Sequence, residues 1–430
     1  MQRLDPPAAG RQSPHAAFGP GGDRNSSPPC DVQATACVED TGRRGDRPRR
    51  EGATDAIVVG AGLAGCALAD ALIRRAWRVT VIECNDHVGG VVAGIPLLAQ
   101  HPALSPGADR RSLLLIEALM ASIRLQERLG DAFTWSGRFQ PMSIAEARQR
   151  TAAIPSTIAQ AIESSSLATH GIDGSQGIWY PRCAIGDPQR WWQRLLQAPL
   201  VDVRLSRRVA GISRRHGHWE ASDSDGALIA TAPVMILANQ ADAFRLAAMP
   251  EAASGRLRLS ELQVAIGTAE SALAGSGNGR LQPILGGSRY RIEQPGIRCI
   301  TGPVRPGDDI LIDGFRLPGE TTDDDAYQWR LSAPAERLLL RDNLPMIGAA
   351  PATAEILAGR ERFERNDRLP LPRQPGLHLL TGLGGRGLLW SVLGAEIIAA
   401  RVNDEPAIVE RDLQAAVDPS RFLKRMLRRA

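Results

Sequence analysis

The segment that most constrains this 430-residue chain is a glycine-rich turn between a short strand and a helix. Residues 55–60 are a β-branched run, residues 66–76 carry apolar side chains at helical spacing, and residues 78–83 form a second β-branched run. Gly60-Ala-Gly62-Leu-Ala-Gly65 links the first run to the helix. This order predicts an α/β fold that begins with a strand–helix–strand unit.

Each glycine of this turn stands where a dinucleotide-binding unit needs one. Gly60 permits the tight turn, Gly62 lets the backbone approach a pyrophosphate, and Gly65 allows the helix to pack closely on the strand. The start of the helix offers backbone N–H groups and a positive dipole end to phosphates. Glu83 ends the second strand, where a carboxylate can accept hydrogen bonds from a ribose. The predicted dinucleotide-binding residues of this unit are Gly60, Gly62, Leu63, Ala64, Gly65 and Glu83.

The segments that follow favour FAD over NAD as the dinucleotide. The pair Gly89-Gly90 comes shortly after the ribose acid and is typical of a second phosphate-side element in FAD enzymes, so Gly90 joins the predicted cofactor site. An NAD enzyme more often carries a second complete strand–helix–strand nucleotide unit. Residues 233–242 instead form an apolar run that opens into a polar loop, similar to the strand that returns to the cofactor in FAD oxidoreductases.

A second strand, glycine loop and helix lie late in the chain. Residues 377–380 predict the strand, residues 381–387 the loop, and residues 389–401 the helix. The flat face and carbonyls of a flavin ring need close backbone approach, which glycine allows. An ordinary turn between a strand and a helix would not need so many glycines. The loop residues predicted to meet the flavin are Gly384, Gly385 and Gly387.

The remaining segments predict a second domain. Residues 112–129 are expected to form a helix capped by Ser112 and stopped by Gly130, and residues 201–230 a small meander. Residues 246–335 lack helical periodicity and read as sheet-rich. We therefore expect a Rossmann-like FAD-binding domain with a second, sheet-rich α+β substrate domain. The expected boundaries are 53–137, 200–245 and 336–412 for the first, 138–199 and 246–335 for the second, and 413–430 for a basic C-terminal segment.

Three tryptophans stand close together in the sequence between the two predicted domains. Trp179, Trp191 and Trp192 fall within a short span. Clustered aromatic side chains can line a pocket for a flat base. Packing in the core or between domains is the alternative, and it is the favoured one.

The N-terminal segment and the cysteines set the expected class of protein. Residues 1–52 contain seven Pro and seven Gly with few large apolar side chains, so a disordered tail is expected. Its arginine pairs could mimic an export signal, but the apolar run behind them carries the glycine loop. The six cysteines form no Cys-x-x-Cys pair, and we expect neither a metal site nor a disulfide scaffold. Since no apolar run is long enough to span a membrane, a cytoplasmic protein is expected.

Several motifs together resemble a known family. The FAD loop, the strand before Asp242, Asp342-Asn-Leu-Pro-Met-Ile-Gly348 and the Gly384 loop are similar to the D-amino-acid oxidase and glycine oxidase superfamily. Residues 55–430 resemble, more narrowly, the C-terminal FAD domain of the bifunctional tRNA methylaminomethyl-thiouridine biosynthesis protein family. The segments that carry this closer resemblance are 101–105, 376–387, 395–399 and 418–425. The family usually reads Gly-Ser-Arg-Gly where this chain has Gly384-Gly385-Arg386-Gly387.

This resemblance implies an activity and a partner. It implies FAD-dependent oxidation of the carboxymethylaminomethyl group on the wobble uridine of tRNA, which yields the aminomethyl form and glyoxylate. The partner would be the anticodon region of tRNA. A 52-residue segment is too short for the family's N-terminal methyltransferase, and a separate methyltransferase is left open as a further partner. Two alternatives stay open: an oxidase of small N-substituted glycines, and a tRNA-binding protein without catalysis.

Two arginines are predicted to carry the chemistry. In the superfamily an arginine that binds the substrate carboxylate precedes the Asp-x-x-Pro-x-x-Gly element, and the matching residue is Arg337, five positions before Asp342. A guanidinium fork suits that carboxylate by bidentate pairing. The alternative for Arg337 is an ion pair with Glu336 or Asp342. Arg386 is expected to neutralise negative charge on the flavin, with packing of the loop as its alternative.

The end of the chain is strongly basic. Residues 418–430 contain a single acid, Asp418, and a series of cations that suits contacts with phosphates. A solvated helix face is the alternative interpretation. The cations are Arg421, Lys424, Arg425, Arg428 and Arg429.

Overall fold

The structure is a computed structural model, and it places most of the chain beyond the N-terminal segment. It describes residues 55–107, 109–163, 176–250, 257–268, 284–286, 290–294, 297–303, 328–332, 335–366 and 368–428. The predicted disordered tail, residues 1–52, lies outside the described residues. So do parts of the predicted substrate domain between residues 246 and 335, and Arg429 at the end of the chain.

A six-stranded sheet forms the centre of the fold, with the order β20-β21-β13-β1-β2-β9. Its strands run parallel except for the edge strand β20. The chain steps outward from β1 through β2 to β9, then returns to the other side of β1 with β13. The carboxyl ends of these strands therefore surround a point where the strand order reverses, which is where open α/β sheets bind ligands. The strands are β1 (Ala56–Val59), β2 (Val79–Ile82), β9 (Val201–Arg204), β13 (Val234–Leu237), β20 (Met346–Pro351) and β21 (Arg373–Thr381).

Both faces of this sheet are covered, as the alternating side chains of β1 show. Ala56 and Val58 belong to a buried cluster with helices α1 (Leu63–Ile73), α2 (Arg110–Leu129) and α10 (Gly387–Val402). Ile57 and Val59 belong to a second cluster on the opposite face, with Trp219 and Phe422. Because every residue of β1 is buried, the strand reads as a continuous apolar run, as central parallel strands do. The α/β class expected from the sequence is confirmed.

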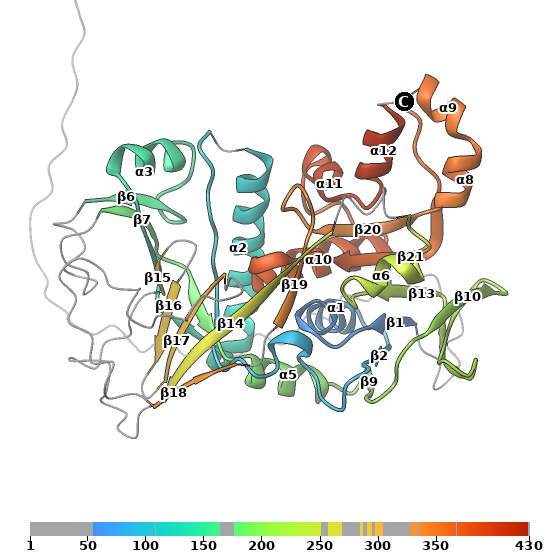
Figure 1. Cartoon of the computed structure of the whole chain (residues 1–430), viewed down its shortest axis with the longest axis horizontal. Helices are drawn as coiled ribbons and strands as arrows, with labels where there is room; N and C mark the ends of the chain where they lie inside the picture. The colour runs from blue at the N-terminus through green and yellow to red at the C-terminus, as the bar shows by residue number, and fades with distance from the viewer. Residues whose placement is uncertain are drawn as a thin grey trace, which may run out of the picture. The chain divides into compact units, whose positions relative to one another are not determined.

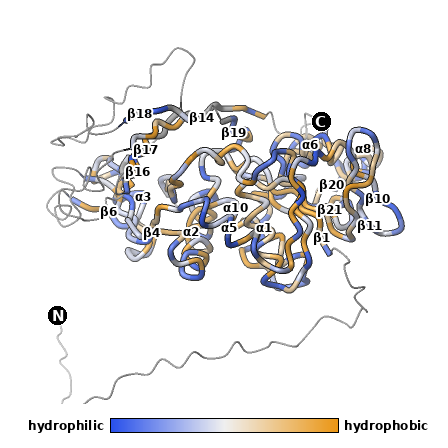
Figure 2. Tube along the Cα trace, turned by 90° about the horizontal axis from the view of Figure 1, so that it is seen from below, coloured by the Kyte–Doolittle hydropathy of each residue, from blue (hydrophilic) through white to orange (hydrophobic). Residues whose placement is uncertain are grey.

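A separate three-stranded antiparallel sheet packs beside the parallel one. It consists of β10 (Gly211–Arg215), β11 (His218–Ser222) and β12 (Leu228–Ala232), and the trace of β10 and β11 is largely hydrophilic (Figure 2). The expectation that residues 201–212 all belong to this meander is wrong for its first half. β9 pairs in parallel with β2 instead, because a β-branched strand in the register Val79↔Val201 covers the open edge of the parallel sheet.

Helix α2 begins earlier than its sequence pattern indicates. Asp109 is the N-cap, and its carboxylate accepts a hydrogen bond from the Ser112 N–H at 2.8 Å. Ser112, the expected cap, lies inside the helix, and its hydroxyl accepts from the Ser105 N–H. Gly130 ends the helix as expected. Asp109 is the favoured N-cap because its carboxylate also interacts favourably with the positive end of the helix dipole.

A second large sheet lies beside the parallel one, at the left of Figure 1. Its order is β18-β14-β17-β16-β15-β5-β7-β6, and β19 pairs with β14. The described part of residues 257–335 is thus made mostly of strands, as expected for this region, whereas Leu246 still belongs to helix α6 (Asp242–Leu246). The strands are β5 (Arg138–Pro141), β6 (Gln160–Ile162), β7 (Gly177–Tyr180), β14 (Arg258–Thr268), β15 (Ile284–Gly286), β16 (Tyr290–Gln294), β17 (Ile297–Pro303), β18 (Gln328–Leu331) and β19 (Ala335–Leu339).

Short elements complete the described chain. β3 (Leu98–Ala99), β8 (Ala184–Gly186) and β4 (Phe133–Trp135) form a small sheet. The remaining α-helices are α3 (Ile144–Thr151), α5 (Pro188–Leu196), α6 (Asp242–Leu246), α8 (Thr353–Ala358), α9 (Arg360–Arg365), α11 (Arg411–Val417) and α12 (Arg421–Leu427). Among the described residues, no helix combines the length and hydrophobicity that a membrane-spanning segment requires.

The three neighbouring tryptophans are core residues. Trp191 and Trp192 are each 1% exposed, and Trp179 is 5% exposed. All three are therefore unavailable as an open stacking surface, and the packing alternative is confirmed. Trp192 still shapes the site described below, because its ring fills the space beside Gly89.

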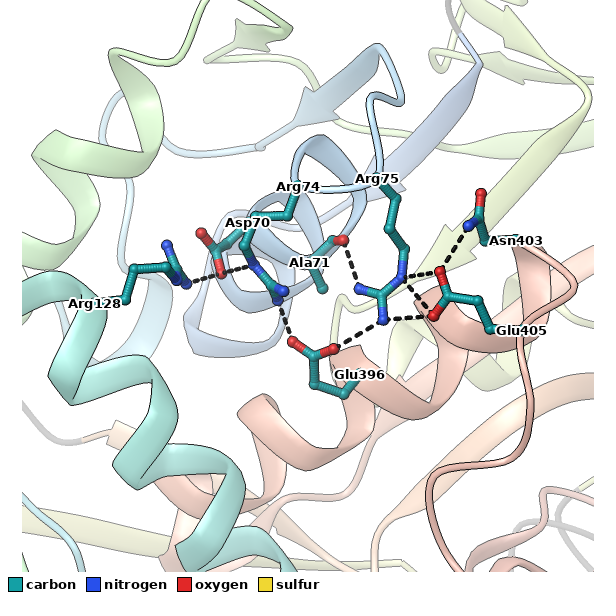
Figure 3. A network of polar contacts seen from close by, with 8 residues as sticks. All are labelled: Asp70, Ala71, Arg74, Arg75, Arg128, Glu396, Asn403 and Glu405. Carbon is teal, nitrogen blue, oxygen red and sulfur yellow. Dashed lines mark hydrogen bonds and ion pairs between the residues drawn. The ribbon is translucent and has the colours of Figure 1, made fainter. Parts of the chain in front are cut away.

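An ion-pair network fixes one end of helix α1 (Figure 3). Arg75 pairs with Glu405 at 2.8 Å and with Glu396 of α10 at 3.1 Å. Arg74 also pairs with Glu396, and Asp70 pairs with Arg128 of α2. Hydrogen bonding from Arg75 is the main cause that holds the pKa of Glu405 below its usual value. The network holds the C-terminal end of α1 against two other helices, and so orients the N-terminal end, which faces the predicted phosphates.

A buried histidine in the central sheet makes stability sensitive to acid. Burial, with a smaller contribution from the charge of Arg401, lowers the pKa of His378 from 6.5 to about 3. The folded protein therefore keeps His378 neutral at pH values where the unfolded chain protonates it. The stability that depends on the neutral ring is complete above about pH 6.5 and is lost as the pH falls from about 6.5 towards 3, by up to about 1.4 kcal/mol per pH unit.

We expect His378→Gln to remove this part of the acid sensitivity. Between about pH 6.5 and 5, the free energy of unfolding of wild type should fall by about 2 kcal/mol more than that of the variant. Urea unfolding at both pH values measures the difference. Equal losses in the two proteins would contradict a neutral buried ring.

Candidate cofactor and active site

A cavity of about 500 Å³ opens at the carboxyl ends of β1, β2, β13 and β21. It lies where the strand order reverses, as an α/β ligand site should. The nucleotide loop and Glu83 line one part of it, and β19 with the late glycine loop lines another. Ten of the twelve predicted site residues line this one cavity: Gly60, Gly62, Leu63, Ala64, Glu83, Gly90, Arg337, Gly384, Gly385 and Gly387.

The first glycine loop has the geometry expected of its sequence. Gly60 has a φ of +101°, and a Cβ there would lie 2.8 Å from the Ala238 carbonyl oxygen. A Cβ at Gly65 would lie 1.8 Å from the Gly60 carbonyl oxygen, so Gly65 serves the packing of the helix on the strand and does not line the cavity. Gly62 differs from both, because the nearest atom to its Cβ position is 4.0 Å away. The protein itself leaves room at Gly62, and that room faces the cavity.

Helix α1 directs its N-terminus at this space. Its N-cap is Gly62, which has no side chain to satisfy the first N–H groups of the helix. Such groups, with the dipole of the helix, attract a phosphate. Leu63 and Ala64 occupy the first turn, as predicted for the pyrophosphate contact.

Glu83 is buried and held by the loop. Its Oε2 accepts a hydrogen bond from the Ala61 N–H at 2.7 Å, and its Oε1 accepts from the Asn85 N–H at 2.9 Å and from Asn85 Nδ2 at 2.8 Å. Oε2 thus accepts one hydrogen bond from the described residues and keeps a lone pair for a ribose hydroxyl. The sequence did not indicate that Glu83 also fixes the glycine turn.

The pair Gly89-Gly90 brings a second backbone segment to the same place. Gly89 has a φ of +105°, donates its N–H to the Ala61 carbonyl at 2.9 Å, and would clash with Trp192 if it carried a Cβ. The Cβ position of Gly90 lies 3.5 Å from the Gly62 Cα. The two glycine segments therefore form one cradle, as the sequence predicted for an FAD site.

The late glycine loop meets both the nucleotide loop and β19. A Cβ at Gly387 would lie 3.0 Å from Leu63 Cδ1, and a Cβ at Gly385 would lie 3.0 Å from Arg337 Nη1. Gly384 has a φ of +56° and lies beside Leu339. Three segments far apart in the sequence thus converge on one cavity.

The two predicted arginines are placed differently. Arg337 lines the cavity from β19, with its guanidinium beside Gly385. Asp342, one of its alternative partners, is bound by Arg421, which donates from Nε and Nη2 at 2.9 Å each. Arg386 precedes helix α10 and is not among the residues that line the cavity in the described part of the chain. Its predicted contact with the flavin stays a prediction without support from this arrangement.

Other cavity residues carried little or no signal in the sequence. Asn239 follows β13, lines the cavity, and has a buried Oδ1 with no hydrogen-bond partner among the residues that the structure describes. Arg207 and Arg208 line the cavity beyond β9. Cys299 also lines it, and burial raises the pKa of its thiol to about 12, so the thiol stays protonated. The polar loop after residues 233–238 was the one available signal for Asn239, but no residue of that loop was predicted for the site.

These features fit a dinucleotide. The cradle at Gly62 and Gly90 leaves room for a pyrophosphate, and the buried Asn239 Oδ1 needs a donor that a bound ligand can supply. Glu83 offers an acceptor to a ribose, and the Gly384 loop allows a flat ring to approach the backbone.

Comparison with known proteins agrees with this geometry. A family described as FAD dependent oxidoreductase, abbreviated DAO, matches residues 55–401. The chain belongs to this family. It is therefore an FAD-dependent oxidoreductase, and the prediction of FAD as cofactor is confirmed.

Curated relatives carry a more specific name. The tRNA 5-methylaminomethyl-2-thiouridine biosynthesis bifunctional protein MnmC of Burkholderia orbicola is 33% identical over 413 residues, which cover 90% of this chain and 63% of that protein. The protein of the same name from Ralstonia nicotianae is 32% identical over 410 residues. This match covers 87% of this chain and 61% of that protein. The chain thus spans somewhat under two thirds of the length of each of these relatives.

Solved structures support the fold. Glycine oxidase from Geobacillus kaustophilus superposes with a TM-score of 0.62 at 17% identity, and covers 85% of this chain and 98% of that chain. Iminodiacetate oxidase from Chelativorans sp. superposes with a TM-score of 0.58 at 18% identity, and covers 83% of this chain and 97% of that chain. At these identities the likeness concerns the fold.

Proposed function

We propose that this FAD-dependent oxidoreductase acts on the carboxymethylaminomethyl group of the wobble (2-thio)uridine of tRNA and releases glyoxylate. The observation that carries the proposal is the position of Arg337 in the cofactor cavity, with its guanidinium beside Gly385 of the glycine loop. The names of the curated relatives supply the substrate class.

The substrate group is an N-substituted glycine, and its chemistry suits this cavity. FAD, when bound, supplies the two-electron acceptor. Oxidation removes a hydride from the methylene carbon and a proton from the nitrogen, which leaves a carbon–nitrogen double bond. Water adds to that bond and the carbon–nitrogen bond breaks, so the uridine keeps an aminomethyl group and glyoxylate leaves. Little acid–base machinery is needed, because orientation of the methylene is the main task.

The protein's own residues would perform that orientation. Arg337 can hold the carboxylate through two parallel N–H donors, which fixes its plane as well as its position. Val264, Ile292 and Leu338 line the cavity around it and are buried. Apolar walls keep water away and strengthen the ion pair with the carboxylate. In this proposal the strands β14, β16, β17 and β19 form the substrate side of the cavity.

Mass spectrometry of wobble nucleosides in cells that lack this gene tests the proposal. We expect carboxymethylaminomethyl-uridine to accumulate, and the wild-type gene to restore the normal pattern. A gene that encodes Gly62→Val should not restore it, because that variant is expected to lose FAD. An unchanged nucleoside pattern in the deletion strain would reject tRNA as the substrate.

A small-molecule oxidase is the main alternative, since Arg337 could hold the carboxylate of any N-substituted glycine. Rapid bleaching of the purified yellow protein by sarcosine or glycine, with no reaction on tRNA, would favour it. A yellow protein that neither substrate bleaches would favour a non-catalytic tRNA-binding protein. Substrate-dependent bleaching by tRNA from the deletion strain is the outcome we expect.

A further inference from the structure

We propose that a groove between helices α11 and α12 and the start of α2 binds the phosphodiester backbone of the substrate RNA. This inference rests on the proposed function. The groove has a volume of about 520 Å³ and is separate in its lining residues from the cofactor cavity. Figure 1 shows α11 and α12 beside each other above β20.

Helix α12 separates its apolar side chains from most of its basic ones. Phe422, Leu423 and Leu427 are buried in the cluster that contains Ile57 and Val59, on the face of the parallel sheet opposite helices α1 and α10. Lys424 and Arg425 stand between them in the sequence, Arg428 follows Leu427, and all three cations line the groove. The helix therefore packs with one face and presents cations on the other.

Arg421 belongs to the packed face, which corrects its expected role in phosphate binding. It is 5% exposed, and its guanidinium forms a bidentate pair with Asp342 and donates to the Leu344 carbonyl at 2.8 Å. Burial raises the pKa of the Asp342 carboxyl, but hydrogen bonds and charge, mainly from Arg421 with smaller contributions from the Leu344 N–H and Arg425, outweigh it and hold that pKa below its usual value. Arg421 anchors α12 to the turn after β19, and Arg425 also pairs with Asp342, at 3.2 Å.

The groove carries an excess of positive charge. Its lining contains five cations and two acids. Both acids have cationic partners, since Asp412 pairs with Arg110 at 3.4 Å and Asp418 pairs with Arg373 at 2.9 Å. The cations come from two separate parts of the chain, residues 110 and 421–428, so the charge is gathered by the fold and is not only a run in the sequence. Phosphates that enter such a groove release condensed counterions, which is the main source of affinity for a nucleic-acid backbone.

The groove also lies within reach of the reactive cavity. Arg337 of the cavity and Asp342, which holds Arg421 and Arg425, are five residues apart on one segment. Five residues span at most about 18 Å even when fully extended. A nucleic-acid strand, at about 3.4 Å per nucleotide along its axis, covers this distance in roughly five nucleotides. RNA whose modified uridine enters the cavity could therefore place neighbouring phosphates on α12.

Charge reversal tests the groove better than deletion. Removal of residues 418–428 would also remove the buried Arg421, Phe422 and Leu423, so the protein could fail to fold for reasons unrelated to RNA. Lys424→Glu and Arg428→Glu reverse charges of the groove lining and leave those buried side chains in place. Arg214→Glu, on the exposed strand β10, is the matched control with the same change of charge.

The measurement is binding of a fluorescent anticodon stem-loop RNA to the FAD-loaded proteins, by anisotropy, at several salt concentrations. Each groove variant should bind RNA more weakly than wild type and should lower the slope of log K against log salt by about one. Arg214→Glu should bind as wild type does. Groove variants that match the control in affinity and slope would overturn the proposal.

The single lysine of the chain offers a direct footprint. Lys424 is the only lysine among the 430 residues, so an amine-reactive acetylating reagent has one side-chain target. RNA should protect Lys424 from acetylation, as read by mass spectrometry of the peptides. Protection by phosphatidylserine vesicles and not by RNA would assign the groove to an anionic membrane surface and overturn the RNA proposal.

The outcomes also separate this proposal from the proposed function. RNA binding that is insensitive to Lys424→Glu would reject the groove and leave the proposed substrate in place. Groove-dependent RNA binding together with an unchanged nucleoside pattern in the deletion strain would support the groove and reject the proposed reaction. Failure of the wild-type protein to bind RNA would overturn both.

Discussion

Replacement of Gly62 by valine should yield a folded protein that no longer binds FAD. The protein has room for the new side chain, because the nearest atom to the Cβ position lies 4.0 Å away. Its φ of −76° and ψ of −169° suit a β-branched residue. A ligand phosphate at the N-terminus of α1 would meet the added methyl groups, whereas the empty protein would not. We therefore expect loss of the yellow colour with little change in thermal stability of the FAD-free protein.

Two further glycine variants make this result specific. Gly94→Val adds the same side chain close by in the sequence, where nothing lies within 4 Å of the Cβ position, and should keep FAD. Gly65→Ala should damage folding itself, since its Cβ would lie 1.8 Å from the Gly60 carbonyl oxygen. Flavin absorbance of the purified proteins and melting curves after removal of FAD measure both effects. Full flavin occupancy in Gly62→Val would show that the phosphates bind elsewhere.

The strand–helix–strand unit of residues 55–83 could be predicted because interactions between residues close in the sequence specify each of its parts. Strand, glycine turn, helix and acid occupy consecutive stretches of residues 55–83, and each has a local physical reason. The late loop weakens one of the sequence arguments for FAD over NAD, namely that an NAD enzyme more often carries a second nucleotide unit. Gly382-Leu-Gly384-Gly-Arg-Gly387 repeats the Gly-x-Gly-x-x-Gly spacing after a strand and before a helix, as a second nucleotide loop would. The structure places it in the first cavity instead, beside Leu63 and Arg337.

What the sequence could not show depends on contacts between distant segments. Arg207 and Arg208 line the cavity because β9 pairs with β2, a long-range pairing that the meander interpretation excluded. Arg421 looked like one more exposed cation until Asp342, 79 residues earlier, was found to bind it. In both cases the residue type was ordinary, and the tertiary partner decided its role.

Replacement of Arg337 by alanine should slow the reaction without removing the cofactor. A charge-assisted pair between the guanidinium and the glycine-like carboxylate contributes roughly 1.5–3 kcal/mol. Its loss should lower kcat/KM by about one to two orders of magnitude. The effect should be the same for the tRNA substrate and for a small N-substituted glycine, because both present the same carboxylate. FAD content and RNA binding should stay at wild-type levels.

The neighbour of Arg337 allows a finer test of the same contact. A Cβ at Gly385 would lie 3.0 Å from Arg337 Nη1, at the flexible end of the side chain. Gly385→Ser should therefore shift the guanidinium by a few tenths of an ångström and should impair the reaction less than Arg337→Ala. Arg337→Lys keeps the charge but loses the planar fork, so it should recover only part of the lost rate. Stopped-flow reduction of the flavin by each substrate measures all three variants. Equal rates in wild type and Arg337→Ala would remove Arg337 from the substrate site, and the carboxylate would then need another cation of the cavity, such as Arg207 or Arg208.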